Sequence, residues 1–590
     1  MSIRLNRREL IQKGLAGFGA LSLPVALTAC RDDNENTAGS TLKVQFLHGV
    51  ASGDPLHDRV ILWTRLTPND NAARLEVVWE ISADQDFKQL VNTGKVQTNA
   101  AQDFTVKVDA DRLQAGTEYY YRFRFGNTVS AVGQTKTLSQ RSDQVKFAVC
   151  SCSNYPAGYF HVYKEMAQEN NLDVIIHLGD YIYEYGQGGY ATDEAKQLGR
   201  TFAADNDKEI IKLDDYRKRY ALYRSDADLQ AAHQRYPFIV IWDDHELSND
   251  TWEAGADNHQ EDEGSFIERK LAALQAYFEW MPIRPVAEND HLNIYRQFDF
   301  GGLVNLMMLD TRILARHKQL NYNDYMTATG IDAVKFQADL LNPQRTLMGV
   351  AQRQWLQVQL MQSAAPWNVL GQQVLMAKML IPQELLLLLG QITNGDQRPE
   401  TLAQMKQKIE ELVTLKMRSK ANDPTLTAMD EARLNAVAPY NLDAWDGYAY
   451  DREVVYGTLQ QLGKKAVVLA GDTHNAWAAS LHTHETNHEV GVEFATSSVS
   501  SPGIEYYLNV PAAEMVELEN AFKLLIDELD YCNLNQRGYL TVTFNHDQVF
   551  ADWKFVDTVK AREYKIDSTR SHQMAYDVHL KPIIDVAKTA

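Results

Sequence analysis

The stretch DVIIHLGDYIY, residues 173–183, joins an apolar run to a glycine, an acidic residue and two tyrosines. Asp173–His177 predicts a β-strand, because it is rich in β-branched residues and ends at a turn signal. Gly179 permits close approach of the backbone, and Asp180 then presents a carboxylate at the end of the strand. The stretch therefore predicts a strand whose carboxyl end carries chemistry.

The same arrangement recurs along the chain after about residue 140. Apolar runs alternate with longer helical segments, the pattern of a layered α/β domain. We expect strands at Val145–Cys150, Asp173–His177, Phe238–Trp242, Leu303–Leu309, Trp367–Leu370 and Lys465–Leu469. Polar residues follow these strands in turn, namely Cys152, Asp180, Asp244, Asp310, Gln372 and Asp472. They are expected to converge outside the carboxyl edge of one sheet, where α/β sheets bind ligands.

Two regions depart from this pattern. Residues 41–140 contain short alternating runs and turn residues, which predict a small all-β sandwich. Within it, Leu113–Tyr119 resembles the tyrosine corner of fibronectin type III and immunoglobulin-like domains. The region 141–590 forms the α/β domain, and its helical, charged segment at about 379–440 is predicted to be an insertion. That insertion is either a lid or a solvated decoration.

Composition limits the classes of function. The chain has 590 residues, 45% hydrophobic and 23% charged, and therefore room for two or more soluble domains. Its net charge of −20 argues against specific binding of nucleic acid, because a phosphate backbone attracts basic surfaces. An anionic ester substrate would need a focused cationic site, which bound metal ions supply.

The N-terminus predicts export. Arg7 and Arg8 precede a modestly apolar stretch, as in signals read by the twin-arginine export machinery. The stretch ends in Leu27-Thr28-Ala29-Cys30, which resembles a bacterial lipobox. We therefore expect residues 1–40 to be a signal and tether. The protein is then periplasmic or otherwise extracytoplasmic and anchored to the membrane by a lipid on Cys30. Ordinary signal cleavage, with Cys30 lost or left free, is the alternative.

Asp243-Asp244-His245-Glu246 is the second chemical signal. Four ionisable residues directly after an apolar strand are costly to bury unless they bind a metal or transfer protons. His245 has the ordinary imidazole pKa, about 6.5, that suits proton donation to a leaving alkoxide.

Three further residue types favour a metal site. Tyr183 lies one turn from Asp180, and its phenol needs a strongly polarising cation such as ferric iron to ionise near neutral pH. The alternative is that it is a packing aromatic. Asp472 and His474 follow another strand, and imidazole suits iron or zinc. Cys152 lies beyond its strand, where a thiolate can reach a metal, whereas Cys150 is expected in the core; a Cys150–Cys532 disulfide is unsupported.

Taken together, these motifs resemble the PhoD-type alkaline phosphatase/phosphodiesterases, a branch of the calcineurin-like metallophosphoesterases. The resemblance extends nearly end to end. His48–Pro55 resembles the opening of the family's N-terminal β domain, and Asn441–Tyr448 and Thr496–Ser501 resemble late family blocks. The wider superfamily has an acidic residue in place of Cys152 and an asparagine in place of Asp244, so these two residues point to the PhoD branch.

The resemblance implies a fold, a cofactor set and a reaction. The fold would be a metallophosphoesterase-type layered α/β sandwich preceded by the small β domain. A ferric ion would be held by Cys152, Asp180, Tyr183 and His474. One or two calcium ions would share Asp180 and take oxygen ligands from Asp244, Gln372 or Gln373, and Asp472. A metal-activated water would then hydrolyse small-molecule or polymeric phosphate mono- or diesters.

Contacts to the phosphate, the oligomeric state and two alternative functions are further expectations. Asn249 or Arg312 would contact the phosphate, and the protein is expected to be a monomer. One alternative is a dedicated phosphodiesterase acting on lipids, polymers or nucleotides. Another, from a different class, is a surface-anchored binding lipoprotein without catalysis, which would carry no metal.

Overall fold

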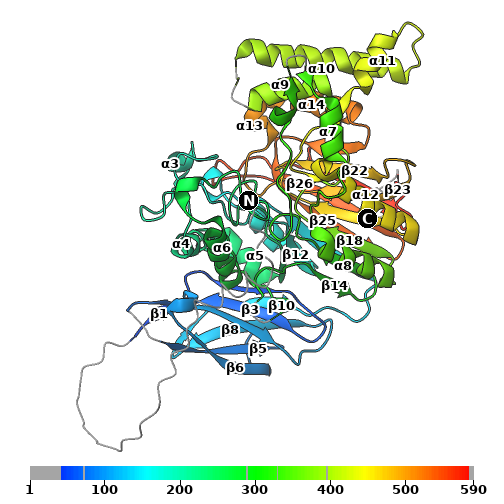
Figure 1. The fold of residues 1–590 in the computed structure, drawn as a ribbon. Coiled ribbons are helices and arrows are strands. Elements are labelled where there is room, and N and C mark those ends of the chain that lie inside the picture. The colour runs from blue at the N-terminus through cyan, green and yellow to red at the C-terminus, as the bar shows by residue number, and fades with distance from the viewer. Residues whose placement is uncertain are drawn as a thin grey trace, which may run out of the picture. The chain divides into compact units, whose positions relative to one another are not determined.

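The computed structural model describes residues 42–583, apart from 71–73, 288–289, 328–329, 394–395 and 397. The expected signal and lipobox therefore lie outside the described residues. From Lys43 on, the chain forms one compact unit. Within it, the N-terminal strands lie at one end and a group of helices at the other, with two large sheets between them (Figure 1).

All six strands expected after residue 140 are present. They are β11 (Gln144–Cys150), β12 (Val174–His177), β13 (Phe238–Val240), β15 (Val304–Met308), β18 (Trp367–Gly371) and β21 (Ala466–Ala470). Every residue of β12, β13, β15, β18 and β21 is buried. Burial on both faces explains why these strands are continuous apolar runs without alternation.

The strands do not share one sheet, so that expectation was wrong. β11, β12 and β13 are parallel neighbours in a nine-stranded sheet, and β15, β18 and β21 are parallel neighbours in a seven-stranded sheet. The two sheets pack face to face around one apolar core, in which Phe147 contacts Phe300. A bridge between Ser151 and Ser498 joins the loops of the two sheets, so the carboxyl ends of both strand sets still meet.

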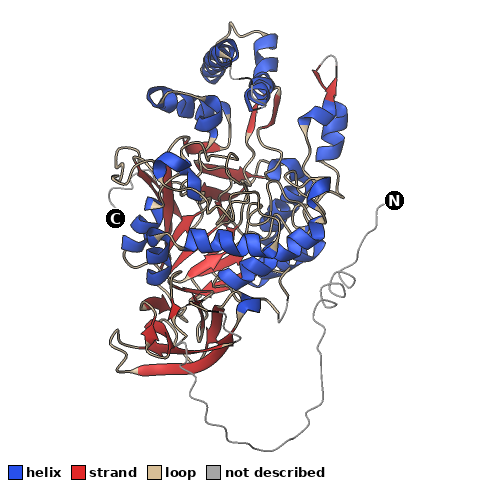
Figure 2. Ribbon diagram, turned by 90° about the vertical axis from the view of Figure 1, so that its left-hand side faces the viewer, coloured by secondary structure: helices blue, strands red, loops and turns tan. Residues whose placement is uncertain are grey.

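Helices cover the outer faces of both sheets, as Figure 2 shows. On the nine-stranded side lie α2 (His161–Gln168), α4 (Leu213–Arg224), α5 (Ala227–Arg235) and α6 (Phe266–Trp280). On the seven-stranded side, α8 (Gly349–Gln362) packs against α12 (Ala449–Leu462). The predicted layered α/β fold is therefore confirmed.

The N-terminal all-β region is also confirmed, and it shares a sheet with the α/β core. β2 (Val50–Gly53), β3 (Val60–Arg65) and β7 (Thr105–Ala110) extend the nine-stranded sheet, because β2 pairs with β13. A separate sheet contains β5 (Leu75–Ser82), β6 (Leu90–Thr98), β8 (Glu118–Phe125) and β10 (Gly133–Lys136). The Tyr119 hydroxyl accepts a hydrogen bond of 2.9 Å from the Gln114 backbone N–H, the geometry of a tyrosine corner.

The segment 379–440 contains three helices, α9 (Gln383–Thr393), α10 (Pro399–Lys420) and α11 (Ala428–Asn435). Two short antiparallel strands, β19 (Leu380–Pro382) and β20 (Val437–Pro439), close its base. The helices pack on α13 (Ile504–Leu508) and α14 (Met515–Leu525). α13 follows the loop that carries part of the functional site, so the insertion supports one side of that site.

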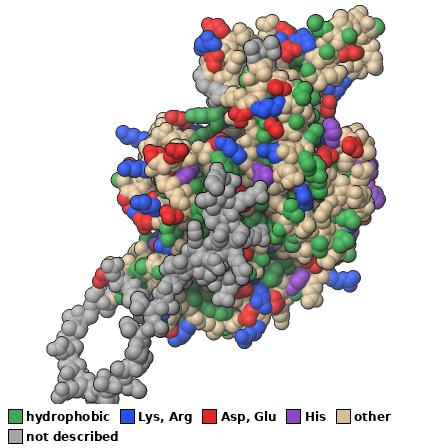
Figure 3. Space-filling model, viewed as in Figure 1, with side chains coloured by type: hydrophobic (Ala, Val, Ile, Leu, Met, Phe, Trp, Pro, Cys, Tyr) green, Lys and Arg blue, Asp and Glu red, His purple; other side chains and the backbone are tan. Residues whose placement is uncertain are grey.

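The C-terminal strands lie at an edge of the nine-stranded sheet, and charged side chains of both signs lie on the surface. β26 (Gln548–Val556) and β27 (His572–Asp577) form the outer edge of the nine-stranded sheet. Acidic and basic side chains are interspersed over the visible part of the face in Figure 3. Among the described residues, none of the helices combines the length and the apolar character needed to span a bilayer.

Candidate metal centre

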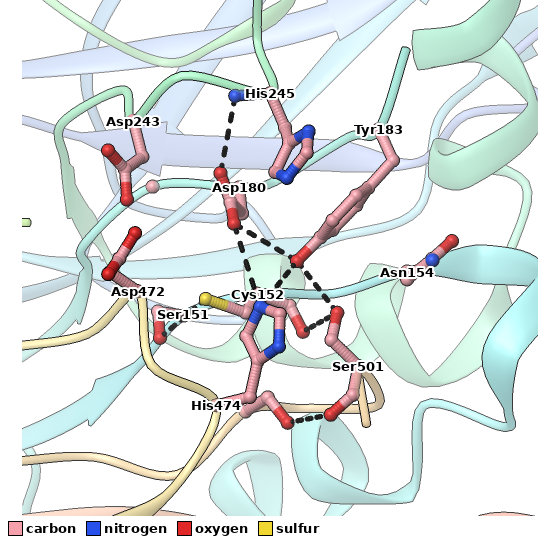
Figure 4. A network of polar contacts seen from close by, with 12 residues as sticks. Ser151, Cys152, Asn154, Asp180, Tyr183, Asp243, His245, Asp472, His474 and Ser501 are labelled. Carbon is pink, nitrogen blue, oxygen red and sulfur yellow. Dashed lines mark hydrogen bonds and ion pairs between the residues drawn. The ribbon is translucent and has the colours of Figure 1, made fainter. Parts of the chain in front are cut away.

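Four side chains from three loops meet beyond the strand ends (Figure 4). The Tyr183 hydroxyl lies 3.0 Å from Asp180 Oδ2 and 3.1 Å from His474 Nε2. Cys152, Asp180 and His474 each offer a ligand atom within 4.8 Å of the others. A thiol, a carboxylate, an imidazole and a phenol therefore converge on one point.

The backbone is held in an uncommon conformation at this point. Cys152, Asp180, Asp472 and His474 have φ values of 60°, 55°, 64° and 63°. Left-handed conformations of non-glycine residues are unfavourable, and they cluster at functional sites because the surrounding structure enforces them. The loops thus position their ligand atoms at a cost in local strain.

Gly179 makes the close approach of two loops possible. A Cβ atom at this position would lie 2.4 Å from the Cβ of Asp243, and the residue has a φ of 106°. Gly471 serves the same purpose on the other sheet, since a Cβ there would lie 2.6 Å from Ser151 Oγ. The Gly-Asp pairs of the sequence are therefore needed for space as well as for the carboxylate.

A second group of acidic side chains adjoins the first. Asp180, Asp244 and His245 lie within 4.8 Å of one another, and so do Asp243, Asp244 and Asp472. Burial raises the pKa of Asp180 and of Asp243 well above the usual range, and neighbouring carboxylates raise both further. Asp180 is shared between the thiol-containing group and the acidic group, as a ligand bridging two cations would be.

The donor set fits metal ions. Asp243 Oδ2 is buried and has no hydrogen-bond partner among the described residues. A buried charged oxygen in that state is costly, and a cation removes the cost. The acidic group offers the carboxylate oxygens that calcium prefers, and the thiol, phenol and imidazole suit a transition metal.

His474 is held in the form that binds a metal. Its Nδ1 lies 2.7 Å from the carbonyl oxygen of Pro502 and therefore carries the proton. The lone pair of Nε2 then faces Tyr183 and Asp180. Tyr190 adds a contact of 3.1 Å between its hydroxyl and Nδ1. A backbone acceptor that fixes the ring and its tautomer is typical of metal-binding histidines.

Ser501 connects the two sides of the site. Its Oγ lies 2.7 Å from the Tyr183 hydroxyl and 3.0 Å from the Cys152 carbonyl oxygen. Burial raises the pKa of Tyr183 well above its usual value. An ionised phenol at this position therefore needs a cation beside it. Sequence analysis placed Ser501 in a family block but assigned it no role.

His245 is paired with a carboxylate that sequence analysis missed. Its Nδ1 lies 2.6 Å from Glu184 Oε2, and Glu184 also accepts hydrogen bonds of 2.8 Å from the Asn249 backbone and the Asn258 side chain. The His245 ring stacks on Tyr183 with centroids 4.2 Å apart. Burial lowers the pKa of His245, but Glu184 and Asp180 outweigh it and the net shift is well above the usual value. In the sequence, the only indication of a role for Glu184 was its position directly after Tyr183.

Glu246 is a second missed residue, and it shapes the loops. Its carboxylate accepts hydrogen bonds from the backbone N–H groups of Asp180, Tyr181 and Asp243, at 3.0, 2.6 and 2.8 Å. It thereby ties the loop after β12 to the loop after β13. Four consecutive ionisable residues after an apolar strand indicated a buried polar role for Glu246. They did not indicate which backbone groups it would bind.

Asp310 and Gln372 do not join the site, although both follow strand ends. Asp310 accepts hydrogen bonds from the backbone N–H groups of residues 312–314 and so caps its own loop. The Gln372 amide oxygen accepts a 3.0 Å bond from Trp445 Nε1. Gln373, the stated alternative, uses its amide oxygen for Thr311 and its amide nitrogen for Trp242. Buried amides need such partners, and both glutamines find them within the protein, so a glutamine ligand to calcium stays a prediction.

Arg312 is surrounded by carboxylates instead of facing an open substrate site. Nε bonds to Asp243, Nη1 lies 2.5 Å from Asp443 and Nη2 lies 2.6 Å from Asp472. The side chain is fully buried. A buried cluster of acids requires such a counter-charge, so Arg312 orients acidic residues here, contrary to the expected phosphate contact. Asn249 is partly exposed on the loop of His245.

The three cysteines in the described part of the chain are all free and buried. Cys150 lies at the end of β11, in the apolar core. Cys152 is the thiol grouped with Asp180 and His474. Cys532 packs in the core of the other sheet. The geometry thus favours Cys152 over Cys150 as a ligand.

Comparisons with known proteins identify the family of this chain. The sequence model of the PhoD-like phosphatase family matches residues 147–553, and that of the PhoD-like phosphatase N-terminal domain matches residues 32–139. Alkaline phosphatase D from Bacillus subtilis (strain 168) is 36% identical over 514 residues, covering 84% of this chain and 76% of the relative. A solved structure described as the structure of PhoD superposes with a TM-score of 0.71 at 32% identity, covering 91% of this chain and 92% of the other.

These matches span both the N-terminal β region and the α/β region, and the relative is an alkaline phosphatase. A binding lipoprotein without catalysis is not supported by them. The chain belongs to the PhoD-like phosphatase family and is a metal-binding hydrolase of phosphoric esters.

Proposed function

We propose that the protein hydrolyses phosphate mono- and diesters with a ferric ion held by Cys152, Asp180, Tyr183 and His474. One or two calcium ions are held beside it by Asp180, Asp244 and Asp472, with Asp243 as a further oxygen donor. The observation that carries the proposal is the convergence of Tyr183, His474 and Asp180 within hydrogen-bonding distance. A phenol and an imidazole beside a shared carboxylate form a donor set for a hard trivalent cation.

The proton transfer is assigned to side chains of the protein itself. When bound, the cations activate the attacking water and neutralise charge on the phosphate oxygens. His245 donates the proton that the leaving oxygen needs, and Glu184 holds the imidazole through Nδ1 so that Nε2 is turned toward the substrate. Arg312 keeps Asp243 and Asp472 in place beside the reacting group.

The metal assignment is tested on the purified full-length protein by elemental analysis and a visible absorption spectrum. We expect iron and calcium to copurify, together with a visible band from charge transfer between the Tyr183 phenolate and ferric iron. The Tyr183→Phe variant should lose the band. Tyr181→Phe is the matched control, because Tyr181 is equally buried but its hydroxyl bonds to His233. Colourless protein with full iron content would contradict the assignment of Tyr183.

We also propose that the protein is exported by the twin-arginine route and anchored by a lipid on Cys30. The support is the paired Arg7 and Arg8 and the Leu27–Cys30 sequence. Cells expressing the protein should incorporate labelled fatty acid into it, and Cys30→Ala should abolish the labelling. Arg7→Lys together with Arg8→Lys should retain the protein inside the cell. Labelling that persists in Cys30→Ala would reject the anchor.

A further inference from the structure

A continuous set of aromatic rings leads from the metal centre to the surface. Tyr190 stacks on His474 with centroids 6.0 Å apart and an interplanar angle of 25°. Tyr506 meets Tyr190 edge to face at 6.2 Å, and Tyr507 meets Tyr506 edge to face at 5.5 Å. Tyr185 lies 6.1 Å from Tyr190 and 5.4 Å from His245. We call Tyr185, Tyr190, Tyr506 and Tyr507 the aromatic wall.

The outer rings of the wall are exposed although they adjoin a buried site. Tyr506 is 47% exposed and Tyr507 is 37% exposed. Burial raises the pKa of Tyr185 and of Tyr190, and Tyr507 raises both further. Tyr507 joins the wall through its edge-to-face contact with Tyr506. Exposed tyrosines at the mouth of a polar site are typical of surfaces that bind planar groups.

The wall is fixed in place, as a preformed binding surface should be. The Tyr506 hydroxyl donates a 3.1 Å hydrogen bond to Asp193. Asn475 accepts a 3.1 Å bond from the Ile504 backbone at the start of α13, and Glu505 bonds to Arg537. The insertion helix α9 packs against α13 from behind. Little conformational entropy is left to lose when a ligand stacks on these rings.

The chemistry of the surroundings indicates the ligand. Asp193 lies against the wall, where a further anionic group on the substrate would be repelled, whereas the charge of Glu505 is paired with Arg537. The wall itself offers neutral π faces, on which a planar ring stacks with little dependence on its substituents.

We propose that the aromatic wall is a subsite for a planar, uncharged ring carried by the phosphate ester, either an aryl group or a nucleobase. The inference rests on the proposed function and deepens it by naming the class of substrate. The ring is the substituent that stays on phosphorus while the other ester bond is cleaved. The protein thus prefers phosphodiesters with a planar group over esters with a small alkyl group.

The test compares diesters that share one leaving group. Methyl, phenyl and thymidine p-nitrophenyl phosphates all release p-nitrophenolate, so differences in kcat/KM report on the second substituent. For the wild type we expect kcat/KM to be about tenfold higher for a ring ester than for the methyl ester, mainly through KM. The phenyl and thymidine esters distinguish a general aryl site from one that needs a nucleobase.

Variants assign the preference to the wall. Tyr506→Leu with Tyr507→Leu should lower the ring-to-methyl ratio to about one, whereas the paired substitutions to Phe should keep it near the wild-type ratio. Tyr450→Leu is the matched control, because Tyr450 on α12 is also exposed, at 38%. Phenylphosphonate and methylphosphonate are also compared as inhibitors of the wild type. The ratio of their inhibition constants is a second measure of the preference for a ring, and it does not depend on how well a variant folds.

The two proposals fail in different ways. If the metal-loaded wild type hydrolyses none of the three esters, the proposed function is wrong and the subsite falls with it. If it hydrolyses all three with equal kcat/KM and the Leu variants leave the ratio unchanged, the subsite is wrong and the proposed function stands.

Discussion

The Tyr183 hydroxyl lies 3.1 Å from His474 Nε2, although 291 residues separate them along the chain. Each residue follows a strand of a different sheet, so only the packing of the two sheets makes the contact. Asp180 is also bonded to the Tyr183 hydroxyl, and His474 Nε2 lies 3.9 Å from the Asp180 carboxylate.

Asp180→Asn should abolish turnover and release metal together. Asp180 belongs to both ligand groups, and an amide offers no charge to a bridged pair of cations. Elemental analysis and a p-nitrophenyl ester assay of the same preparation check both effects. A variant with full metal content and a normal rate would show that the ligand groups are assigned incorrectly.

Gly179→Ala should disrupt the site, whereas Gly188→Ala should not. Both glycines have positive φ, 106° and 91°, so the backbone strain is similar. Only at Gly179 would the added Cβ meet the Asp243 backbone, while Gly188 has open space. We expect Gly179→Ala to lower metal content and kcat/KM at least about tenfold and stability by about 2 kcal/mol more than the control. Equal effects of the two substitutions would mean that loop spacing is unimportant.

Glu184→Gln should impair hydrolysis according to the leaving group. Glutamine lacks the negative charge that stabilises a protonated His245, so esters that need protonation of the leaving oxygen should slow by about 10²-fold or more. Esters of p-nitrophenol should slow much less, because p-nitrophenolate leaves without a proton. Glu209→Gln is the control, because the carboxylate of Glu209 accepts a hydrogen bond from Arg269 and, among the described residues, not from a histidine. A uniform loss across leaving groups would argue for a structural role instead.

Arg312→Met should destabilise the protein by about 3–5 kcal/mol, because it leaves Asp243 and Asp472 without their buried counter-charge and Asp443 with Arg316 alone. Arg398→Met should change stability by less than about 1 kcal/mol, since its ion pair with Asp396 is at the surface, where Arg398 is 72% exposed. Urea unfolding in the presence of chelator measures the change in stability of both variants. Added calcium should partly restore the stability of Arg312→Met by replacing the lost positive charge.

His48→Gln should reduce the sensitivity of the protein to acid. Burial lowers the pKa of His48 from 6.5 to about 3, with help from Arg65 and Arg224. The folded state keeps His48 neutral, while the unfolded chain binds a proton below pH 6.5. This contribution is complete above pH 6.5 and falls by roughly 1.4 kcal/mol per pH unit as the pH drops toward 3. The urea midpoint of the variant should therefore fall less between pH 6.5 and 4 than that of the wild type.

An exposed histidine provides the comparison for this measurement. His546, whose side chain is 62% exposed, is replaced by Gln in the same way. Parallel curves for the wild type and His48→Gln would exclude His48 as the source of acid sensitivity.

The sequence by itself determined the strands and the polar residues at their ends. Short apolar runs rich in β-branched residues favour buried strands, and ionisable residues directly after them are costly to bury unless they are paired, bind a ligand or react. Cys152, Asp180, Asp244, Asp472 and His474 all follow such runs, so local pattern was enough to place each of them at the carboxyl end of a strand.

Only the tertiary structure decided how the strands divide into sheets and which polar residues face the site. Each strand is apolar on both faces, so its sequence does not specify its neighbour, and the two sheets appeared as one. Gln372 and Arg312 were predicted to face a ligand but bond Trp445 and three acids, while Glu184 came to hold His245. These choices depend on which distant groups remain to be satisfied when the sheets pack, and no local pattern contains that information.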